Sequence, residues 1–305
     1  MPMDADGNCR RYKVVHETDY LYSEPVPLCH NEIHLVPRDT ARQRCLDYQL
    51  AVNPAIDSID RCEDYFGNHV QFFTIQERHS ELSVAATSEV YLEGARYIPP
   101  ESTPPWEQVR LAAQANGPAE SLAACQFTAD SPLAAASAEL AEFAAASFTP
   151  ARPWLEATLD LMARIHREFV YDSTATNVST PLDVVLEMRR GVCQDFAHLQ
   201  IACLRAWGLP ARYVSGYLLT VPPPGMPRLV GADASHAWLA GWCPGWGWVD
   251  FDPTNNLVPS LDHITVAWGR DYSDVCPIKG VFIGGGQHSM RVSVDVQPVE
   301  NGQRA

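Results

Sequence analysis

The chain has 305 residues, of which 46% are apolar and 19% charged, a balance typical of a soluble globular protein with room for two or three domains. Its formal charge of −15, from 37 acidic and 22 basic residues, would repel the phosphate backbone of a nucleic acid. It contains no run of 18 apolar residues, and its polar start, MPMDADGNCRRY, lacks the pattern of a secretion signal. We expect a cytoplasmic protein with no nucleic-acid or membrane partner, although export by another route stays open.

Nine cysteines are scattered along the chain, an odd number without the paired spacings of a disulfide framework. The sequence contains no CxxC pair, so a zinc ribbon or a thioredoxin-type site has no support. We expect most of these thiols to be buried and inert. We also expect no cofactor and no metal.

The first hundred residues have the pattern of strands. Segments rich in β-branched and aromatic residues alternate with turn-like tracts such as NPAID and DYFGN, which favours an antiparallel sandwich or a small barrel. We expect strands over 11–22, 30–38, 46–54, 68–76 and 80–93. The stretch YIPPESTPPWEQ, with four prolines, follows at 97–108. We therefore place a β-rich domain at 1–98 and a linker at 99–130.

Helical signals follow this linker. We expect helices over 131–148, 153–170, 182–190, and from Cys193 to the Gly-Leu-Pro at 208–210. Ser131 and Pro132 are suited to cap and begin the first of them, and Gly191 should close the third. The helix that starts at Cys193 is apolar on more than one side, so it should be central and buried.

Strands are expected again after the buried helix, over 211–219, 235–243, 246–253, 263–269, 280–285 and 288–296. They should form one mostly antiparallel sheet on which the helices pack. Residues 131–305 are therefore expected to be a second domain, and the fold class is α+β.

Cys193 lies two residues after Gly191, where the buried helix is expected to begin. A nucleophilic cysteine needs a lowered thiol pKa and groups that stabilise the thiolate. The free backbone N–H groups of a helix N-terminus carry partial positive charge and can also face a developing oxyanion. The glycine lets the backbone bend and leaves space for a substrate. Taken alone, a cysteine at a helix start is more often structural than catalytic.

His236 and Asp252 are candidates for the base and for the group that orients it. They lie on two strands of an expected hairpin, equally far in sequence from Pro244, so we expect them to lie opposite each other. Opposed side chains on one face have Cβ atoms about 4.5–5.5 Å apart, close enough for an imidazole to bond a carboxylate. A bulge at the turn would shift this pairing. Each residue alone is more often structural, and an Asp before Pro is commonly a turn former. The order Cys, His, Asp is the stronger signal.

Four motifs carry a family resemblance. GVCQDFAHLQIACLRAWGLPARYVSGYL, SHAWLAGW and GWVDFDPTNN contain a Gly-x-Cys helix start, a GLPARYVSGY strand, a His-Ala-Trp strand and an Asp-Pro-Thr turn. In this order they resemble the transglutaminase-like fold of the papain-like thiol enzymes. The start, YKVVHETDYLYSEPVPLCHNEIHLVPRDT, is similar to the β-rich N-terminal domain of the bacterial branch, and DHITVAWGRDYSDVCPIKGVF is similar to its C-terminal stretch.

The resemblance implies Cys193 as nucleophile, His236 as general base and acid, and Asp252 as the group that orients the histidine. The thiolate would attack an amide carbonyl, and water or an amine would resolve the thioester. Asp195 complicates this interpretation, because its charge would oppose thiolate formation if the side chain pointed inward. We expect it instead to cap the helix start, where a negative charge is favourable.

Further residues are candidates for substrate contacts. Trp238 shares the face of the histidine two residues before it and could wall a cleft. Gln194, beside the candidate nucleophile, is a second candidate. His263, Arg270 and Asp271 form a polar cluster in the C-terminal stretch that the resembling branch shares, and a salt-bridged structural turn is at least as good an interpretation of it.

The favoured function is a thiol-dependent amide hydrolase, a cysteine peptidase or amidase, acting on a peptide or another amide-containing substrate. The alternatives are an acyl transferase of the transglutaminase (protein-glutamine gamma-glutamyltransferase) type and a non-catalytic binding module on the same fold. A metal protein built on Cys and His is a weaker alternative. No EF-hand calcium loop is present, so calcium activation has no support. The oligomeric state is left open.

Overall fold

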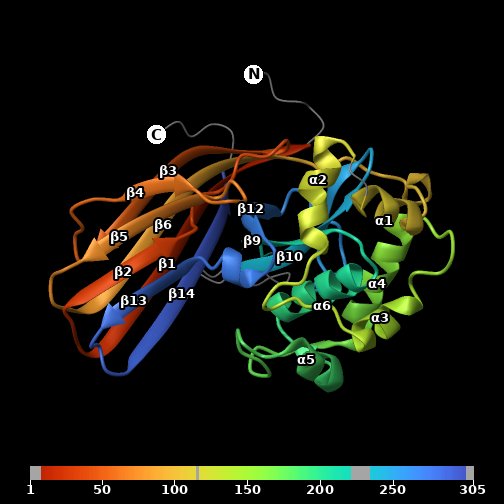
Figure 1. Ribbon diagram of the computed structural model, residues 1–305. Helices are drawn as coiled ribbons and strands as arrows, with labels where there is room; N and C mark the ends of the chain where they lie inside the picture. Colours follow the sequence, from red (N-terminus) through yellow and green to blue (C-terminus); the bar gives the residue numbers. More distant parts are fainter. Residues whose placement is uncertain (1–7, 115–116, 221–233, 300–305) are drawn as a thin grey trace, which may run out of the picture.

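The computed structural model describes residues 8–114, 117–220 and 234–299. Figure 1 shows a β-sandwich, drawn mainly in red, orange and blue, beside a body of helices packed on a sheet. The α+β class with an antiparallel β-rich N-terminal region is confirmed. Among the residues described, no helix is both long enough and apolar enough to cross a membrane.

The sandwich contains two antiparallel sheets of four strands each. In spatial order the first consists of β14 (His288–Pro298), β1 (Cys9–Val26), β6 (His79–Glu93) and β3 (Gln43–Asn53). The second consists of β13 (Ile278–Ile283), β2 (Leu28–Ile33), β5 (His69–Ile75) and β4 (Asp60–Glu63). Alternate residues of these strands form one buried cluster, which includes Ile33, Phe73 and Val84. The sequence alternation therefore reflects strands with one face toward a shared core.

The last two strands do not join the sheet in which the sequence placed them. We expected 280–285 and 288–296 to complete the sheet of the second domain, and this prediction is wrong. β13 pairs with β2, and β14 pairs with β1 along a ladder from Tyr12↔Pro298 to Tyr22↔His288. The long ladder holds β14 at the edge of the sandwich, while its buried Val294 and Val296 pack into the core of the helical body. Part of the range 131–305 therefore returns to the first body.

The stretch 99–130, expected as a linker, is largely helical and packed. It contains η1 (Pro100–Ser102), α1 (Trp106–Gln114), α2 (Ala119–Cys125) and η2 (Gln126–Thr128). Trp106, Val109 and Phe127 are buried in or beside the core of the helical body. The prolines therefore begin short helices here rather than mark an extended connection.

The second body is built on a four-stranded antiparallel sheet. Its strands in spatial order are β11 (Gly247–Phe251), β10 (Ala234–Cys243), β9 (Ala211–Leu218) and β12 (His263–Gly269). Helix α6 (Cys193–Ala206) packs against β9 and β10. The remaining elements are α3 (Ala138–Ala145), α4 (Trp154–Glu168), α5 (Leu182–Met188), the short parallel pair β7 (Val170–Tyr171) and β8 (Arg190–Gly191), and η3 (Tyr272–Asp274).

Local capping explains where two of these helices differ from expectation. α3 begins seven residues later than 131 because the hydroxyl of Ser137, not Ser131, accepts the N–H of Leu140 at 3.2 Å. α5 ends at Met188 and is capped by Arg189, whose φ of 53° places it in the left-handed region, before Gly191 is reached.

Two side-chain amides of the sandwich cover the free edge of β12. Gln43 donates to the carbonyl of Thr265 at 2.7 Å and accepts its N–H at 2.8 Å. Asn68 makes the same pair with Trp268, at 2.8 Å and 2.9 Å. Each carboxamide thus replaces a neighbouring strand, satisfying backbone groups that an edge strand would leave open. These contacts fix the sandwich against the sheet that carries the candidate site.

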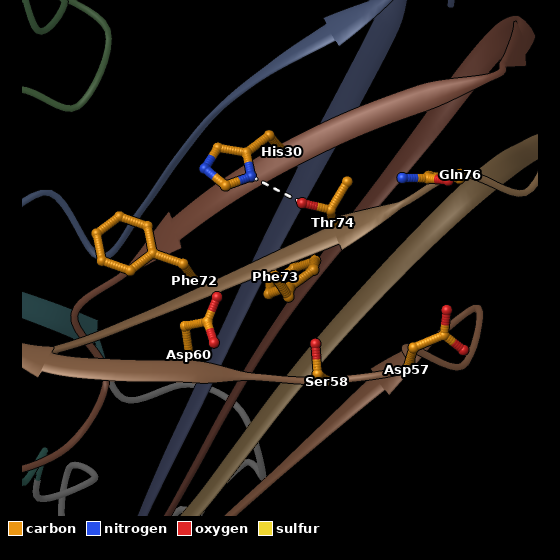
Figure 2. Close-up of a pocket in the computed structure, with 8 residues that line it drawn as sticks. All are labelled: His30, Asp57, Ser58, Asp60, Phe72, Phe73, Thr74 and Gln76. Atoms are coloured by element: carbon orange, nitrogen blue, oxygen red, sulfur yellow. Dashed lines mark hydrogen bonds between the residues drawn. The ribbon is translucent and has the colours of Figure 1, made fainter.

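A cavity of about 180 Å³ lies on the second sheet of the sandwich. Figure 2 shows it lined by His30 on β2, by Phe72 and Thr74 on β5, and by Asp60 on β4. His30 Nδ1 lies 2.8 Å from the Thr74 hydroxyl. This cavity belongs to the N-terminal body and is separate from the site at Cys193.

Candidate active site

Cys193 is the first residue of α6 and is partly exposed. The helix start is held by Asp195, whose Oδ2 accepts the backbone N–H of Val192 at 2.8 Å and the hydroxyl of Thr176 at 2.6 Å. The expectation that Asp195 caps the helix is therefore confirmed. Burial raises the pKa of this carboxyl, and its two hydrogen bonds partly oppose that rise.

Gly191 has a different role from the one expected. A Cβ there would lie 2.7 Å from Oδ2 and 2.9 Å from Cβ of Asp195, so a side chain would displace the cap. The space beside the glycine is filled by the capping carboxylate rather than left for a substrate. Gly191 therefore positions Cys193 through Asp195.

His236 on β10 connects the thiol to a carboxylate. Its Nε2 lies 2.8 Å from Oδ2 of Asp252, and Cys193 is near enough to raise the pKa of the imidazole. Because Nε2 faces the carboxylate, Nδ1 is the nitrogen free to serve the thiol. Burial lowers the pKa of His236, but the bonds to Asp252 and Cys193 outweigh it and raise the pKa to about 9. Asp252 and Cys193 thus favour the protonated form of the imidazole.

Asp252 has 0% of its surface exposed and is surrounded by donors. Besides His236, its Oδ2 accepts His263 Nε2 at 3.0 Å and Asn255 Nδ2 at 2.7 Å. Its Oδ1 accepts the backbone N–H groups of Thr254 at 3.0 Å and Asn255 at 3.1 Å. Burial alone would raise the pKa of this carboxyl, but the histidine bonds hold it well below the ordinary value. Asp252 is therefore ionised and acts only as an acceptor.

Comparison with known proteins places this geometry in a family. Residues 12–91 match the bacterial transglutaminase-like N-terminal region, and residues 141–253 match the transglutaminase-like superfamily. An uncharacterized protein of Mycobacterium tuberculosis (strain H37Rv) is 41% identical over 95% of this chain and 93% of its own length. The chain belongs to the transglutaminase-like superfamily.

Two further proteins are similar over different lengths. A protein-glutamine gamma-glutamyltransferase of Pseudomonas aeruginosa is 36% identical over 97 residues, which are 31% of this chain and 14% of the transferase. The crystal structure of a candidate cysteine protease from Cytophaga hutchinsonii has a TM-score of 0.76 and 24% identity, covering 98% of this chain and 93% of its own. The second likeness shows that the two proteins share a fold across both bodies.

The hairpin register of this transglutaminase-like chain differs from the one expected. Cys243 pairs with Gly247 and Leu239 with Phe251, so the hairpin is centred one residue later than we assumed. If this register continued past the end of β11, Asp252 would lie opposite Trp238. The prediction that His236 and Asp252 lie directly opposite each other is therefore wrong. His236 and Asp252 are instead diagonal neighbours. Diagonal neighbours are farther apart than directly opposed residues, but an imidazole is long enough to reach the carboxylate.

Trp238 lies beneath the two histidines and has 0% of its surface exposed, so it does not wall an open cleft. Its ring stacks on His236 with centroids 6.1 Å apart and meets the ring of His263 edge-on at 5.2 Å. Gly216, which pairs with His236 across β9 and β10, makes room for it. A Cβ at Gly216 would lie 2.5 Å from the indole Cη2 and 2.1 Å from the carbonyl oxygen of Ile264.

The other candidate substrate contacts are separated by the fold. Gln194 donates to the carbonyl of Val178 at 3.3 Å, in the loop beside Cys193. Arg270 instead forms a bidentate ion pair with Asp274, with both nitrogen–oxygen distances at 2.9 Å.

Asp271 is fully buried and caps η3. Its carboxylate accepts the N–H groups of Ser273 at 2.8 Å and Leu133 at 2.9 Å. Arg270 and Asp271 thus have the contacts of a salt-bridged structural turn. His263, assigned to the same cluster from the sequence, lies instead beside Asp252.

Sequence reasoning did not single out Asn255 or Thr176. Asn255 bonds Asp252 through both its backbone N–H and its side-chain amide, and the Asp-Pro-Thr-Asn order is a signal for such an Asx turn. Thr176 bonds Asp195 from a loop 19 residues away, so no local pattern could have identified it.

One group among the described residues has donor atoms close enough to hold a metal ion. These atoms, from His236, Asp252 and His263, lie within 4.8 Å of one another. They are already joined, however, since both Nε2 atoms bond the same carboxylate oxygen. A metal would have to replace the hydrogens that make these bonds, so the arrangement fits a hydrogen-bonded relay better than a metal centre.

Proposed function

We propose that this protein is a thiol-dependent amide hydrolase in which Cys193 is the nucleophile, His236 the general acid and base, and Asp252 the orienting carboxylate. The observation that carries the proposal is the position of His236, whose Nε2 lies 2.8 Å from the buried carboxylate of Asp252 while Cys193 contributes to its raised pKa. The start of α6 adds the partial positive charge of free backbone N–H groups beside the sulfur. The substrate is a peptide or another molecule with an amide bond.

The proposed reaction has two halves. In the first, the Cys193 thiolate adds to the amide carbonyl, and the C–N bond breaks as His236 gives its proton to the leaving amine, which leaves a thioester. In the second, His236 removes a proton from water as the water oxygen attacks the thioester, and the carboxylic acid leaves while the sulfur is released. Throughout, Asp252 keeps the imidazole oriented without itself becoming protonated.

Acyl transfer to an amine is the second candidate, because a Pseudomonas aeruginosa relative is a protein-glutamine gamma-glutamyltransferase. The thioester is common to both reactions, and they differ only in whether water or an amine resolves it. A γ-glutamyl amide incubated with and without an added primary amine distinguishes them. Hydrolysis releases the free acid whether or not the amine is present, whereas transfer yields the new amide and depends on the amine concentration.

Thiol labelling tests the nucleophile. Iodoacetamide at mildly acidic pH should alkylate Cys193 first among the nine cysteines, and His236→Ala should slow that labelling. Cys62 is the matched control, because its side chain is exposed and Cys62→Ser should leave the labelling of Cys193 unchanged. Equal labelling of several cysteines, with no effect of the histidine, would remove the basis for the enzymatic proposal.

A further inference from the structure

His263 is the first residue of β12 and contacts the carboxylate of the proposed relay. Its Nε2 lies 3.0 Å from Oδ2 of Asp252, the same oxygen that His236 bonds at 2.8 Å. The ring is buried, with 5% of its surface exposed, and it packs edge-on against Trp238 at an interplanar angle of 86°. Its Nδ1 is buried and has no hydrogen-bond partner among the described residues.

These contacts determine which ring nitrogen of His263 donates to Asp252. The ionised carboxylate of Asp252 can only accept hydrogen bonds, so Nε2 of His263 must carry its hydrogen. A second hydrogen on Nδ1 would bury a charge and leave an N–H group without an acceptor, which is costly in a site this enclosed. His263 therefore donates to Asp252 from Nε2, and its Nδ1 makes no hydrogen bond among the described residues. It is a fixed donor, whereas His236 is the imidazole that moves a proton.

The sheet is built so that both imidazoles reach one oxygen. His236 on β10 and His263 on β12 flank β9. His263 pairs with Leu218 of β9, and His236 pairs with Gly216, two residues away. Because a side chain there would collide with Trp238, the glycine keeps the indole beneath both imidazole rings. The imidazole of His263 thus belongs to a separate strand, β12, and not to the turn that carries Asp252.

The hydrogen bond from His263 to Oδ2 affects both the proton affinity and the orientation of Asp252. Each hydrogen bond to the carboxylate lowers its affinity for a proton and restricts its rotation. If Asp252 were less well satisfied, it could draw the proton away from His236 or rotate out of line with the imidazole. Either change would reduce the fraction of His236 that is protonated and bonded to a Cys193 thiolate.

We propose that His263 is a positioning residue whose Nε2–H holds Oδ2 of Asp252 in place, so that the carboxylate orients His236 without taking the proton that His236 delivers to the leaving amine. The proposal rests on the function proposed above. It assigns His263 no contact with the substrate, in contrast to the substrate-binding role expected from the sequence.

Two substitutions at this position separate donation from packing. His263→Gln places an amide N–H near the position of Nε2, whereas His263→Leu fills similar space without a donor. We expect His263→Leu to lower kcat about 10-fold or more with little change in KM, and to slow alkylation of Cys193 to a similar extent. His263→Gln should recover both rates to within about threefold of the wild-type protein.

His79 provides a matched control. It is a buried histidine of the sandwich that bonds the carbonyl of Glu77 at 2.8 Å, so His79→Leu removes a comparable group far from the relay. Both leucine variants should lose stability to urea, but only His263→Leu should lose alkylation rate. If His263→Leu does not fold, His263→Asn replaces it, because the shorter side chain places its amide near Nδ1 instead of Nε2.

Equal kcat and alkylation rates in the Gln variant and in the Leu or Asn variant would overturn the proposal, whether both rates stayed at the wild-type value or fell together. Failure of the proposed function gives a different result. In that case the wild-type protein itself shows no preferential labelling of Cys193 and no amide turnover. The labelling of wild-type protein is therefore measured first.

Discussion

The charge state of His236 should make the stability of this protein depend on pH in the alkaline range. Its bonds to Asp252 and Cys193 raise its pKa in the folded protein from 6.5 to about 9, against the lowering effect of burial. In the unfolded chain the pKa returns to about 6.5. A histidine with a raised pKa stabilises the fold fully below the unfolded value and loses that contribution as the pH rises through the folded value.

The expected size follows from the two pKa values. At about 1.4 kcal/mol for each pH unit, a rise from 6.5 to about 9 corresponds to about 3 kcal/mol of folding free energy. This contribution should be present at about pH 6 and absent at about pH 10. Since the side chain of His236 is only 6% exposed, solvent screens little of the interaction.

Urea unfolding of the wild-type protein and of His236→Gln at these two pH values measures the effect. Glutamine keeps an amide donor near Nε2 but does not titrate, so the tyrosines and other cysteines that ionise at alkaline pH contribute equally to both proteins. The wild-type protein should lose about 3 kcal/mol more than His236→Gln between the two pH values. Cys193→Ala should show a smaller difference, because it removes one of the two groups that raise the pKa.

The reasoning is refuted if the wild-type protein and His236→Gln lose the same free energy across this range. That result would mean that His236 has the same pKa in the folded and unfolded states. A difference of the opposite sign would mean that burial outweighs the two hydrogen bonds and that the imidazole is neutral in the folded protein.

Two further predictions concern the packing around the site. Gly216→Ala should lower the free energy of thermal unfolding by about 1–3 kcal/mol and slow the alkylation of Cys193, because its Cβ would collide with Trp238 and with the carbonyl of Ile264. An unchanged alkylation rate would show that the indole does not support His236. Asn68→Ala should cost about 2–4 kcal/mol in urea unfolding, because the partly buried backbone N–H and C=O of Trp268 lose their partners. A loss below about 0.5 kcal/mol would show that this cap does not fix the sandwich to the sheet.

The local structure around Cys193, the proposed nucleophile, was readable from the sequence. The apolar stripe over 153–170 predicted a helix that the structure places at Trp154–Glu168. The start of α6 at Cys193 and the cap by Asp195 were also expected. All these features depend on residues within a few positions of one another, because hydrogen bonds of a helix and its caps link near neighbours in sequence. Such signals are present in the chain before any tertiary contact forms.

Only the tertiary structure decided which distant elements meet. The sequence showed that 280–285 and 288–296 were strands, but their partners, β2 and β1, are more than 240 residues away. It also singled out His263, but not its bond to Asp252. A strand pattern specifies a pleated, half-buried surface and not the strand that pairs with it. Side-chain contacts at the site depend further on register, where a shift of one residue in the hairpin changed which residues lie opposite each other.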